Sequence, residues 1–347
     1  MQVPFLELTS LTLELRSETT PFLPDSFLGG FAPRLRSLEL HAIPFLGLPN
    51  VLLSATHLVT LSLSGIPHSA YISPEEMITC LSVLTSLERL SLGFESPQSC
   101  PDQDTRRPPL PTRTILPALR NFWFKGAYEY FEDLVAPIDA PRIHRFSILF
   151  FNDIDFDTPQ LTQFISRTQT FKANIVHVVF RSHAAWVELQ SQASNRDFEE
   201  VKVEVSCRVP DGQLSFLAQI CNSLPLFSTT ENLYIHEHLS LRLDWKGDIE
   251  NAEWLDLLRP FTAVKDLYLS KKFAPRIAPA LQELTGGRTT DVLPTVQNIF
   301  LEGFKPSGSD QEIEGIGQFI SARQLTKRPV AISVWGDSRG EFGGHRR

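Results

Sequence analysis

The chain has 347 residues, 42% of them hydrophobic, and a net charge of −8. This length fits either two or so compact domains or one repeat array, and the hydrophobic content is sufficient for a continuous core. The acidic balance argues against general nucleic-acid binding, which usually needs a basic face. No stretch approaches the roughly 20 apolar residues of a membrane span, and no secretory signal is present. We therefore expect a soluble cytoplasmic or nuclear protein that binds neither nucleic acid nor membranes.

The cysteine pattern agrees with an intracellular location. Four cysteines occur, at Cys80, Cys100, Cys207 and Cys221, and no two of them have CxxC spacing. Free thiols in a reducing compartment are the expectation.

A hexapeptide of the form Leu-x-x-Leu-x-Leu recurs and organises the chain; it is clearest at residues 35–40, 58–63 and 87–92. Side chains of a strand alternate between two faces, so the last two leucines of each copy point the same way. One copy cannot bury this leucine face alone, whereas stacked copies can. The pattern predicts an α/β leucine-rich-repeat solenoid: a curved array with a mainly parallel sheet on one face and helices and irregular loops on the other.

The first predicted strand, residues 8–15, starts almost at Met1 and has no visible polar cap. A repeat array normally protects its first repeat. We therefore expect a neighbour to cover this edge, or the chain to begin inside a longer gene product, and poor solubility if the edge stays open.

A proline-rich stretch at 96–117 interrupts the array, and the strand motif resumes after it. It is therefore interpreted as a long exposed loop rather than a domain linker. Further copies or strands are predicted at 119–124, 143–148, 173–178, 198–203, 230–235, 264–269, 296–301 and 330–335.

Capping patterns and helical spacing predict helices between the strands. Ser73-Pro74 starts one that runs to about Leu84, and Thr158-Pro159 starts another. The others are predicted at about 213–223, 252–259, 279–284 and 311–325.

The strand starts at 230, 264 and 296 are 34 and 32 residues apart, which exceeds the usual 20 to 29 of leucine-rich repeats. Residues 1–336 are thus predicted to form a single irregular array, with a disordered tail at 337–347. The alternative is an ordinary α/β domain with leucine-rich strands.

The repeat region resembles that of fungal F-box-like leucine-rich-repeat proteins. The likeness lies in residues 35–92, with Ser-Gly-Ile-Pro-His-Ser after the third strand, and in 138–142, 150–161 and 254–261. It implies a substrate receptor of a cullin-type ubiquitin ligase, in which an F-box docks a Skp-type adaptor. No F-box pattern precedes the first strand, so an adaptor is expected only if an upstream F-box exists.

Several groups of residues partly resemble chemical sites. Asp153, Asp155 and Asp157 alternate like the start of a calcium loop but lack its glycine and glutamate, so helix capping and solvation are expected. His236 and His238 could share a face, yet two imidazoles do not make a zinc site. The Gly286-Gly287-Arg288 stretch is interpreted as a helix stop, and the loop with Arg106 and Arg107 either contacts an acidic partner or is simply solvated.

No catalytic signature occurs: there is no G-x-S-x-G elbow, HExxH or cysteine-led motif. The chain is predicted to be non-enzymatic, without cofactor or metal. The leading prediction is a protein-interaction scaffold, the substrate-binding region of an F-box-like receptor. The alternatives are a truncated or degenerate copy without a ligase role, and an enzyme with an unrecognised site.

The residue between the last two apolar residues of each motif should point onto the open face of the sheet. This slot holds Glu39, Ser62, Ser91, Trp123, Ser147, His177, Lys202, Tyr234, Tyr268 and Phe300. Aromatic rings anchor many protein interfaces, so the predicted protein-binding residues are Trp123, Tyr234, Tyr268 and Phe300. The alternative is that these rings only stack on each other or are covered by a loop. On the opposite face, burial is predicted for Leu38, Leu61, Leu90, Phe122, Phe146, Leu233, Leu267 and Ile299.

Overall fold

The computed structural model describes residues 5–15, 22–96, 113–151, 158–168, 174–191, 199–207, 209–238, 249–285, 291–303 and 314–335. The chain divides into two compact units: Met1–Lys172 with Ala193–Ser206, and Ala173–Gln192 with Cys207–Arg347. The candidate calcium loop, Arg106 and Arg107, the 286–288 turn, most of the proline-rich loop and the tail lie outside the described residues. The prediction that 1–336 form one array stays a prediction.

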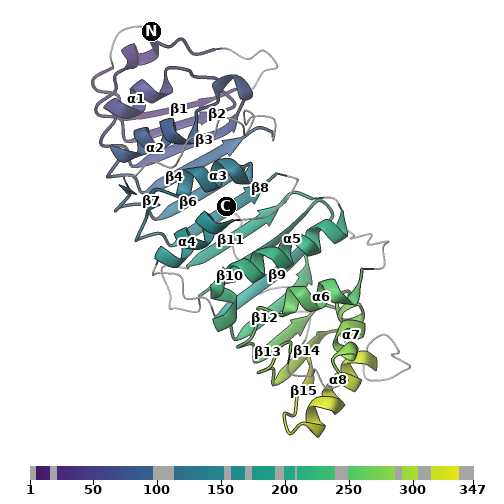
Figure 1. Cartoon of the computed structure of the whole chain (residues 1–347). Helices are drawn as coiled ribbons and strands as arrows, with labels where there is room; N and C mark the ends of the chain where they lie inside the picture. Colours follow the sequence, from purple (N-terminus) through teal and green to yellow (C-terminus); the bar gives the residue numbers. More distant parts are fainter. Residues whose placement is uncertain are drawn as a thin grey trace. The chain divides into compact units, whose positions relative to one another are not determined.

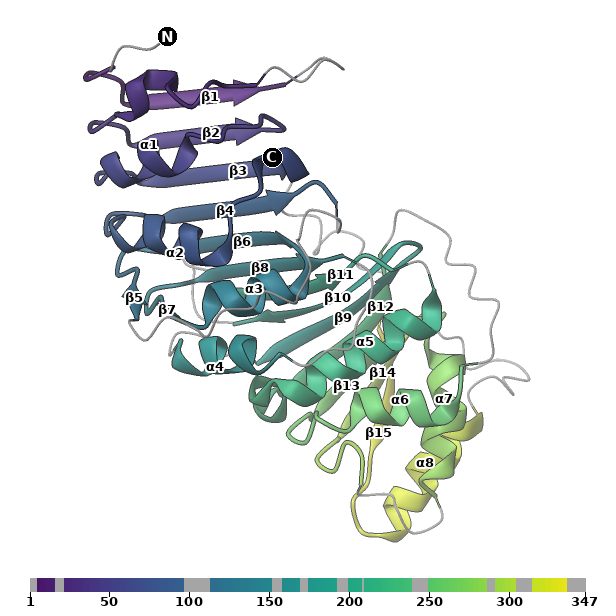
Figure 2. The same ribbon diagram turned by 45° about the horizontal axis from the view of Figure 1, so that its top comes forward.

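The first unit is a parallel sheet with helices on one face (Figure 1). Its strands, in spatial order, are β1 (Ser10–Glu14), β2 (Ser37–His41), β3 (Thr60–Ile66), β4 (Arg89–Phe94), β6 (Asn121–Gly126), β8 (Arg145–Phe150) and β11 (Glu200–Val205). The helices are α1 (Leu48–Ser54), α2 (Pro74–Ser82), α3 (Tyr128–Val135) and α4 (Pro159–Arg167). They pack one on the next, as Figure 2 shows. Two short strands, β5 (Thr114–Ile115) and β7 (Ile138–Asp139), pair separately.

The second unit repeats this architecture with one antiparallel pair. Its strands, in spatial order, are β10 (Ala184–Gln190), β9 (Ile175–Arg181), β12 (Asn232–Glu237), β13 (Asp266–Leu269), β14 (Asn298–Glu302) and β15 (Ala331–Trp335). Strands β9 and β10 form a hairpin, and all later neighbours are parallel. The helices are α5 (Pro210–Ser223), α6 (Asn251–Leu258), α7 (Ala274–Glu283) and α8 (Glu314–Leu325), packed in that order.

The leucine slots of the motif form the core between sheet and helices. All eight residues predicted to be buried are at most 2% exposed, which confirms this part of the prediction. Leu38, Leu61 and Leu90 are register partners on adjacent strands. Burying each apolar side chain of this size stabilises the folded state by about 1.5–3 kcal/mol. The mainly parallel α/β leucine-rich-repeat architecture is therefore observed in each unit.

Five of these helices and strands were not predicted: α1, α3, β10 and the two-residue strands β5 and β7. The N-cap residues of α1 and α3 are Gly47 and Ala127, which have no side-chain oxygen, so the sequence carries no capping pattern for these helices. Strand β10 has no leucine motif, and its pairing with β9 comes from the short Ser182-His183 turn.

The predicted start of one helix was wrong. Helix α7 begins at Ala274, so Pro279 lies inside it rather than at its start. Proline there removes one backbone hydrogen bond, which burial of Ile277, Ala278 and Leu281 offsets. Spatial order in the sheets differs from chain order, because β11 pairs with β8 and β9 pairs with β12.

The two capping predictions had different outcomes. At α2, the Ser73 side chain accepts a hydrogen bond from the Glu76 backbone N–H, as expected. At α4, Thr158 makes no such bond. Instead the buried carboxylate of Glu132, on α3, accepts the N–H groups of Gln160 and Leu161, both at 2.8 Å. One helix thus caps the helix of the next repeat.

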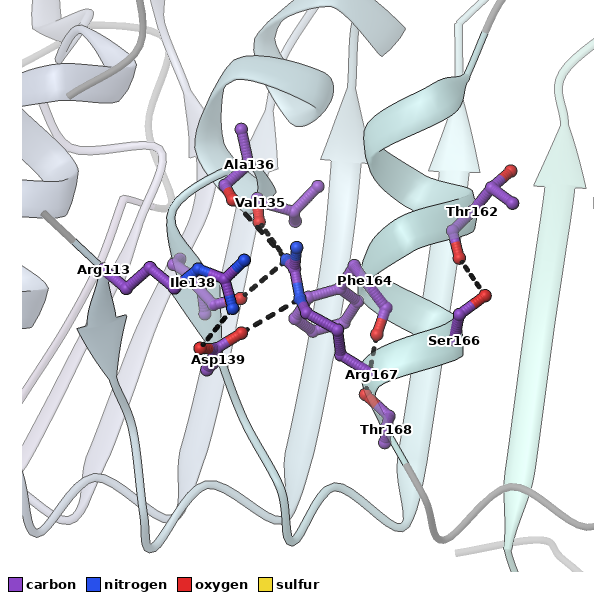
Figure 3. A network of polar contacts seen from close by, with 10 residues as sticks. All are labelled: Arg113, Val135, Ala136, Ile138, Asp139, Thr162, Phe164, Ser166, Arg167 and Thr168. Carbon is purple, nitrogen blue, oxygen red and sulfur yellow. Dashed lines mark hydrogen bonds and ion pairs between the residues drawn. The ribbon is translucent and has the colours of Figure 1, made fainter. Parts of the chain in front are cut away.

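Arginines also join neighbouring repeats. Figure 3 shows Arg167, at the end of α4, with Nη2 at 3.1 Å from the Ile138 carbonyl and Nε at 2.9 Å from Asp139 Oδ1. The same Nη2 donates to the carbonyls that end α3, where a cation is favourable. In the second unit, Arg323 on α8 makes equivalent bonds to the carbonyls of Leu293, Pro294 and Val296. Each arginine satisfies carbonyls of the preceding repeat.

The cysteines within the described residues, Cys80, Cys207 and Cys221, are free. Burial, with the nearby Glu76 carboxylate, raises the pKa of Cys80 to about 11, and burial raises the pKa of Cys221. These two thiols are therefore poor nucleophiles.

Candidate functional site

The slot predicted to face away from the helices is in register along both units. In the first unit, Glu39, Ser62, Ser91, Trp123, Ser147 and Lys202 are successive partners from β2 to β11. In the second, Glu188, His177, Tyr234, Tyr268, Phe300 and Ser333 are successive partners from β10 to β15. Three of the four predicted binding residues are therefore adjacent, and Trp123 belongs to the first unit.

Tyr234, Tyr268 and Phe300 form a continuous stack of rings. We use the name aromatic ladder for these three residues and His177. The ring centroids of Tyr234 and Tyr268 are 4.1 Å apart with the planes at 7°, and those of Tyr268 and Phe300 are 4.4 Å apart at 8°. His177 extends the stack, 4.7 Å from Tyr234 at 20°. Parallel strands in register hold equivalent side chains about 4.8 Å apart, which is the spacing of stacked rings. The three rings after His177 are partly exposed.

Trp335 packs edge-on against the ladder, a contact that the sequence analysis missed. Its ring lies 5.6 Å from Tyr268 at 71° and 6.0 Å from Tyr234 at 64°. Since Ser333 occupies the slot beside Phe300, Trp335 lies two residues further on the same face. The alternating side chains of β15 place Trp335 on this face of the sheet, but they do not indicate in which direction the indole points. The rings thus stack on each other, as the alternative expected, and still expose part of their surface.

The histidines at the end of β12 have different partners. His236 Nε2 lies 3.3 Å from His177 Nδ1. His238 instead faces Arg181 and Trp186: its Nδ1 lies 3.1 Å from Arg181 Nη2, and its ring contacts the ring of Trp186. Among the described residues, no cluster of three or more metal-ligating side chains occurs.

Burial sets the protonation of the histidine pair. Desolvation, and then the neighbouring His236, lowers the pKa of His177 to about 3. Desolvation also lowers the pKa of His236, although the carbonyl and charge of Glu237 oppose it. Both imidazoles are therefore neutral at pH 7. Burial, followed by the hydroxyl of Tyr268, raises the pKa of Tyr234.

In the first unit, the open face is hollowed around Trp123. A groove of about 430 Å³ lies over β3, β4, β6 and β8. We call it the tryptophan groove. It is lined by Trp123 and the polar residues Glu39, Thr60, Ser62, Arg89, Ser91, Asn121, Arg145, Ser147 and Glu200, together with Leu61, Leu90, Phe122 and Phe146. Small serines beside a large indole leave this space open. The groove can therefore receive a side chain next to an aromatic wall.

A second row of polar residues borders this groove. On each strand its member lies two residues before the slot residue, on the same face of the sheet. Thr60, Arg89, Asn121, Arg145 and Glu200 are successive register partners. This row was not predicted, although each of its residues directly precedes the middle apolar residue of its motif. The same periodicity could have revealed the row.

Comparisons with known proteins add little. The sequence matches no protein-family model, and no curated protein matches it. Among solved structures, the chain is similar to the leucine-rich repeat-containing protein LegL7 from Legionella pneumophila, at 14% identity and a TM-score of 0.35. The match covers 90% of this chain and 91% of that chain. Within the described residues, no helix combines the length and apolar character needed to cross a membrane.

Proposed function

We propose that this chain is a non-enzymatic protein-interaction scaffold whose partner binds the aromatic ladder of the second unit. The observation that carries the proposal is the in-register stack of Tyr234, Tyr268 and Phe300, partly exposed on the sheet face opposite the helices. Stacked rings are already ordered, so binding to them loses little side-chain entropy. Tyrosine and other aromatic residues are enriched among the anchors of protein interfaces.

Within this function, we propose the role of a substrate-binding region in an F-box-like ubiquitin-ligase receptor. Its support is the resemblance of the repeat segments to fungal F-box-like leucine-rich-repeat proteins. The full gene product should then capture a Skp-type adaptor in a pull-down, and loss of the ladder should not affect that capture. A gene product that binds no adaptor would refute this finer role and leave the scaffold proposal intact.

The scaffold proposal can be tested by photo-crosslinking. A benzoylphenylalanine in place of Phe300 should crosslink to a partner, which is then purified and titrated against the wild-type chain. The double variant Tyr234→Ala/Tyr268→Ala should weaken that binding at least tenfold, while the melting temperature stays within a few degrees. Phe22→Ala, which removes an aromatic ring that is 63% exposed outside the strands, is the matched control.

A second variant keeps the test decisive if the alanine variant unfolds. Tyr234→Phe/Tyr268→Phe retains the stacked rings and should retain binding. If a crosslinked partner binds the double alanine variant as tightly as wild type, the ladder is not the anchor.

A further inference from the structure

The tryptophan groove of the first unit carries two exposed arginines, Arg89 and Arg145. Arg89 Nε and Nη2 donate to Thr60 Oγ1, at 3.2 and 3.0 Å. Neither Arg89 nor Arg145 forms an ion pair with any of the described residues. Each guanidinium therefore keeps donors available for an anion.

The spacing of these arginines suits one anionic group. Arg89 on β4 and Arg145 on β8 flank Asn121 on β6 in the same register row. Adjacent strands are about 4.8 Å apart, so the two arginine Cα atoms lie about 10 Å apart. Arg89 now points to Thr60 on β3, on the side of β4 away from Asn121. Its exposed side chain is long enough to turn toward β6, where it and Arg145 can reach one oxyanion above Asn121, whose amide can add a hydrogen bond. Guanidinium groups bind carboxylate and phosphate oxygens in a forked geometry.

The rest of the groove restricts what else the ligand can contain. Ser91 and Ser147 flank Trp123 in the slot row, so the indole has small neighbours and an accessible face. An apolar side chain can lie in this space against the ring.

Acidic residues lie at both ends of the groove: Glu39 on β2 and Glu200 on β11. They disfavour a long polyanion such as a nucleic acid, as does the net charge of −8. They tolerate a ligand whose negative charge is confined to the centre.

We propose that the tryptophan groove binds an extended acidic peptide of a partner protein. Its acidic group, a carboxylate or a phosphate, lies between Arg89 and Arg145, and an adjacent apolar side chain packs on Trp123. This second surface goes beyond the proposed function, because it assigns a ligand chemistry to the first unit and does not depend on the aromatic ladder.

A peptide library tests the proposal on the full chain. Nine-residue peptides carry glutamate, phosphoserine, glutamine or lysine at a fixed central position with random flanks. We expect the chain to select peptides with a central glutamate or phosphoserine next to an apolar residue. Comparing the glutamate set with the phosphoserine set shows whether the groove prefers a carboxylate or a phosphate. Anisotropy titration of a selected, fluorescein-labelled peptide should show at least tenfold weaker binding for Arg89→Gln/Arg145→Gln. Arg142→Gln, an exposed arginine outside the groove, should bind like wild type.

Two further variants separate binding from folding. Arg145→Glu should shift selection from acidic to lysine-centred peptides, a change of specificity that a folding defect cannot produce. Ser147→Phe should block the groove without a change of charge and weaken binding at least tenfold. The proposal is overturned if selection shows no acidic preference, if the arginine variants bind unchanged, or if a single-stranded RNA probe binds through these arginines more tightly than the peptides. None of these results depends on Tyr234 or Tyr268.

Discussion

Gly93 on β4 lies directly beneath the indole of Trp123 on β6. A Cβ atom at residue 93 would stand only 2.7 Å from Cζ3 of the indole and 3.0 Å from Cη2. Gly93 is two residues after Ser91 and therefore on the same face of the sheet. The absence of a side chain at residue 93 sets the orientation of the aromatic wall of the tryptophan groove.

Gly93→Ala should consequently displace the indole. Overpacking typically destabilises by about 1–3 kcal/mol, and we expect the lower end because the indole can rotate away from the new methyl group. With 5-fluorotryptophan incorporated, the ¹⁹F resonance of Trp123, assigned through Trp123→Phe, should shift while the other tryptophans stay unchanged. The matched control is Gly317→Ala in α8, where no atom lies within 4 Å of an added Cβ. This control should leave the spectrum unaltered and stabilise slightly. An unmoved Trp123 resonance in Gly93→Ala would contradict the orientation described here.

Much of the fold follows from a local period of two. Leu61 and Ser62 show why: alternation assigns one to the core and the other to the open face, and parallel stacking repeats that assignment on each strand. The same reasoning placed Tyr234, Tyr268 and Phe300 side by side. The row with Arg89 and Arg145 follows from the same period, because it lies two residues before the slot on the same face.

Other features depend on non-local packing that a local pattern does not encode. The β9–β10 hairpin is inserted in the chain between β8 and β11, so the partner of Ser147 is Lys202 rather than His177. The N-terminal cap of α4 comes from Glu132, 28 residues before Gln160. The packing of Trp335 on the ladder depends on a rotamer, which the alternation of β15 does not specify.

The cap formed by Glu132 should be important for stability. This buried carboxylate accepts two backbone hydrogen bonds at a helix N-terminus, where negative charge is favourable. Glu132→Ala leaves both N–H groups without their acceptor and should lower the free energy of unfolding by about 2–4 kcal/mol. Urea denaturation measures this change. Glu88→Ala, at an exposed glutamate, should change stability by less than about 0.5 kcal/mol; equal effects of the two substitutions would refute the capping role.

Arg167 and Arg323 should each be irreplaceable by lysine. Each Nη2 approaches three backbone carbonyls of the preceding repeat. Lysine retains the charge but not the planar fork, and we expect Arg167→Lys and Arg323→Lys to destabilise by about 1–3 kcal/mol each. Hydrogen exchange should show lost protection around residues 135–139 for the first variant and 293–296 for the second. Loss of protection spread evenly over both units in either variant would argue against local repeat-to-repeat contacts.

The buried His177 predicts a specific dependence of stability on pH. The pKa of His177 is about 3 in the folded state and 6.5 as the ordinary value. Well above pH 6.5 the imidazole is neutral in both states and has no effect on the pH dependence. Between pH 6.5 and 3 the unfolded chain binds a proton that the folded chain excludes, so stability falls as the pH is lowered. The slope from this one group reaches at most about 1.4 kcal/mol per pH unit; the lowered pKa of His236 acts with the same sign.

His177→Phe separates this titration from the stacking role of the residue. Phenylalanine can retain the stack on Tyr234 but cannot bind a proton. Urea unfolding at pH 7 and pH 5 should therefore show a smaller loss of stability for the variant than for wild type. His57→Gln removes an exposed imidazole and should leave the wild-type difference unchanged. Should His177→Phe lose as much stability as wild type between these two pH values, the buried neutral imidazole is not the origin of the acid sensitivity.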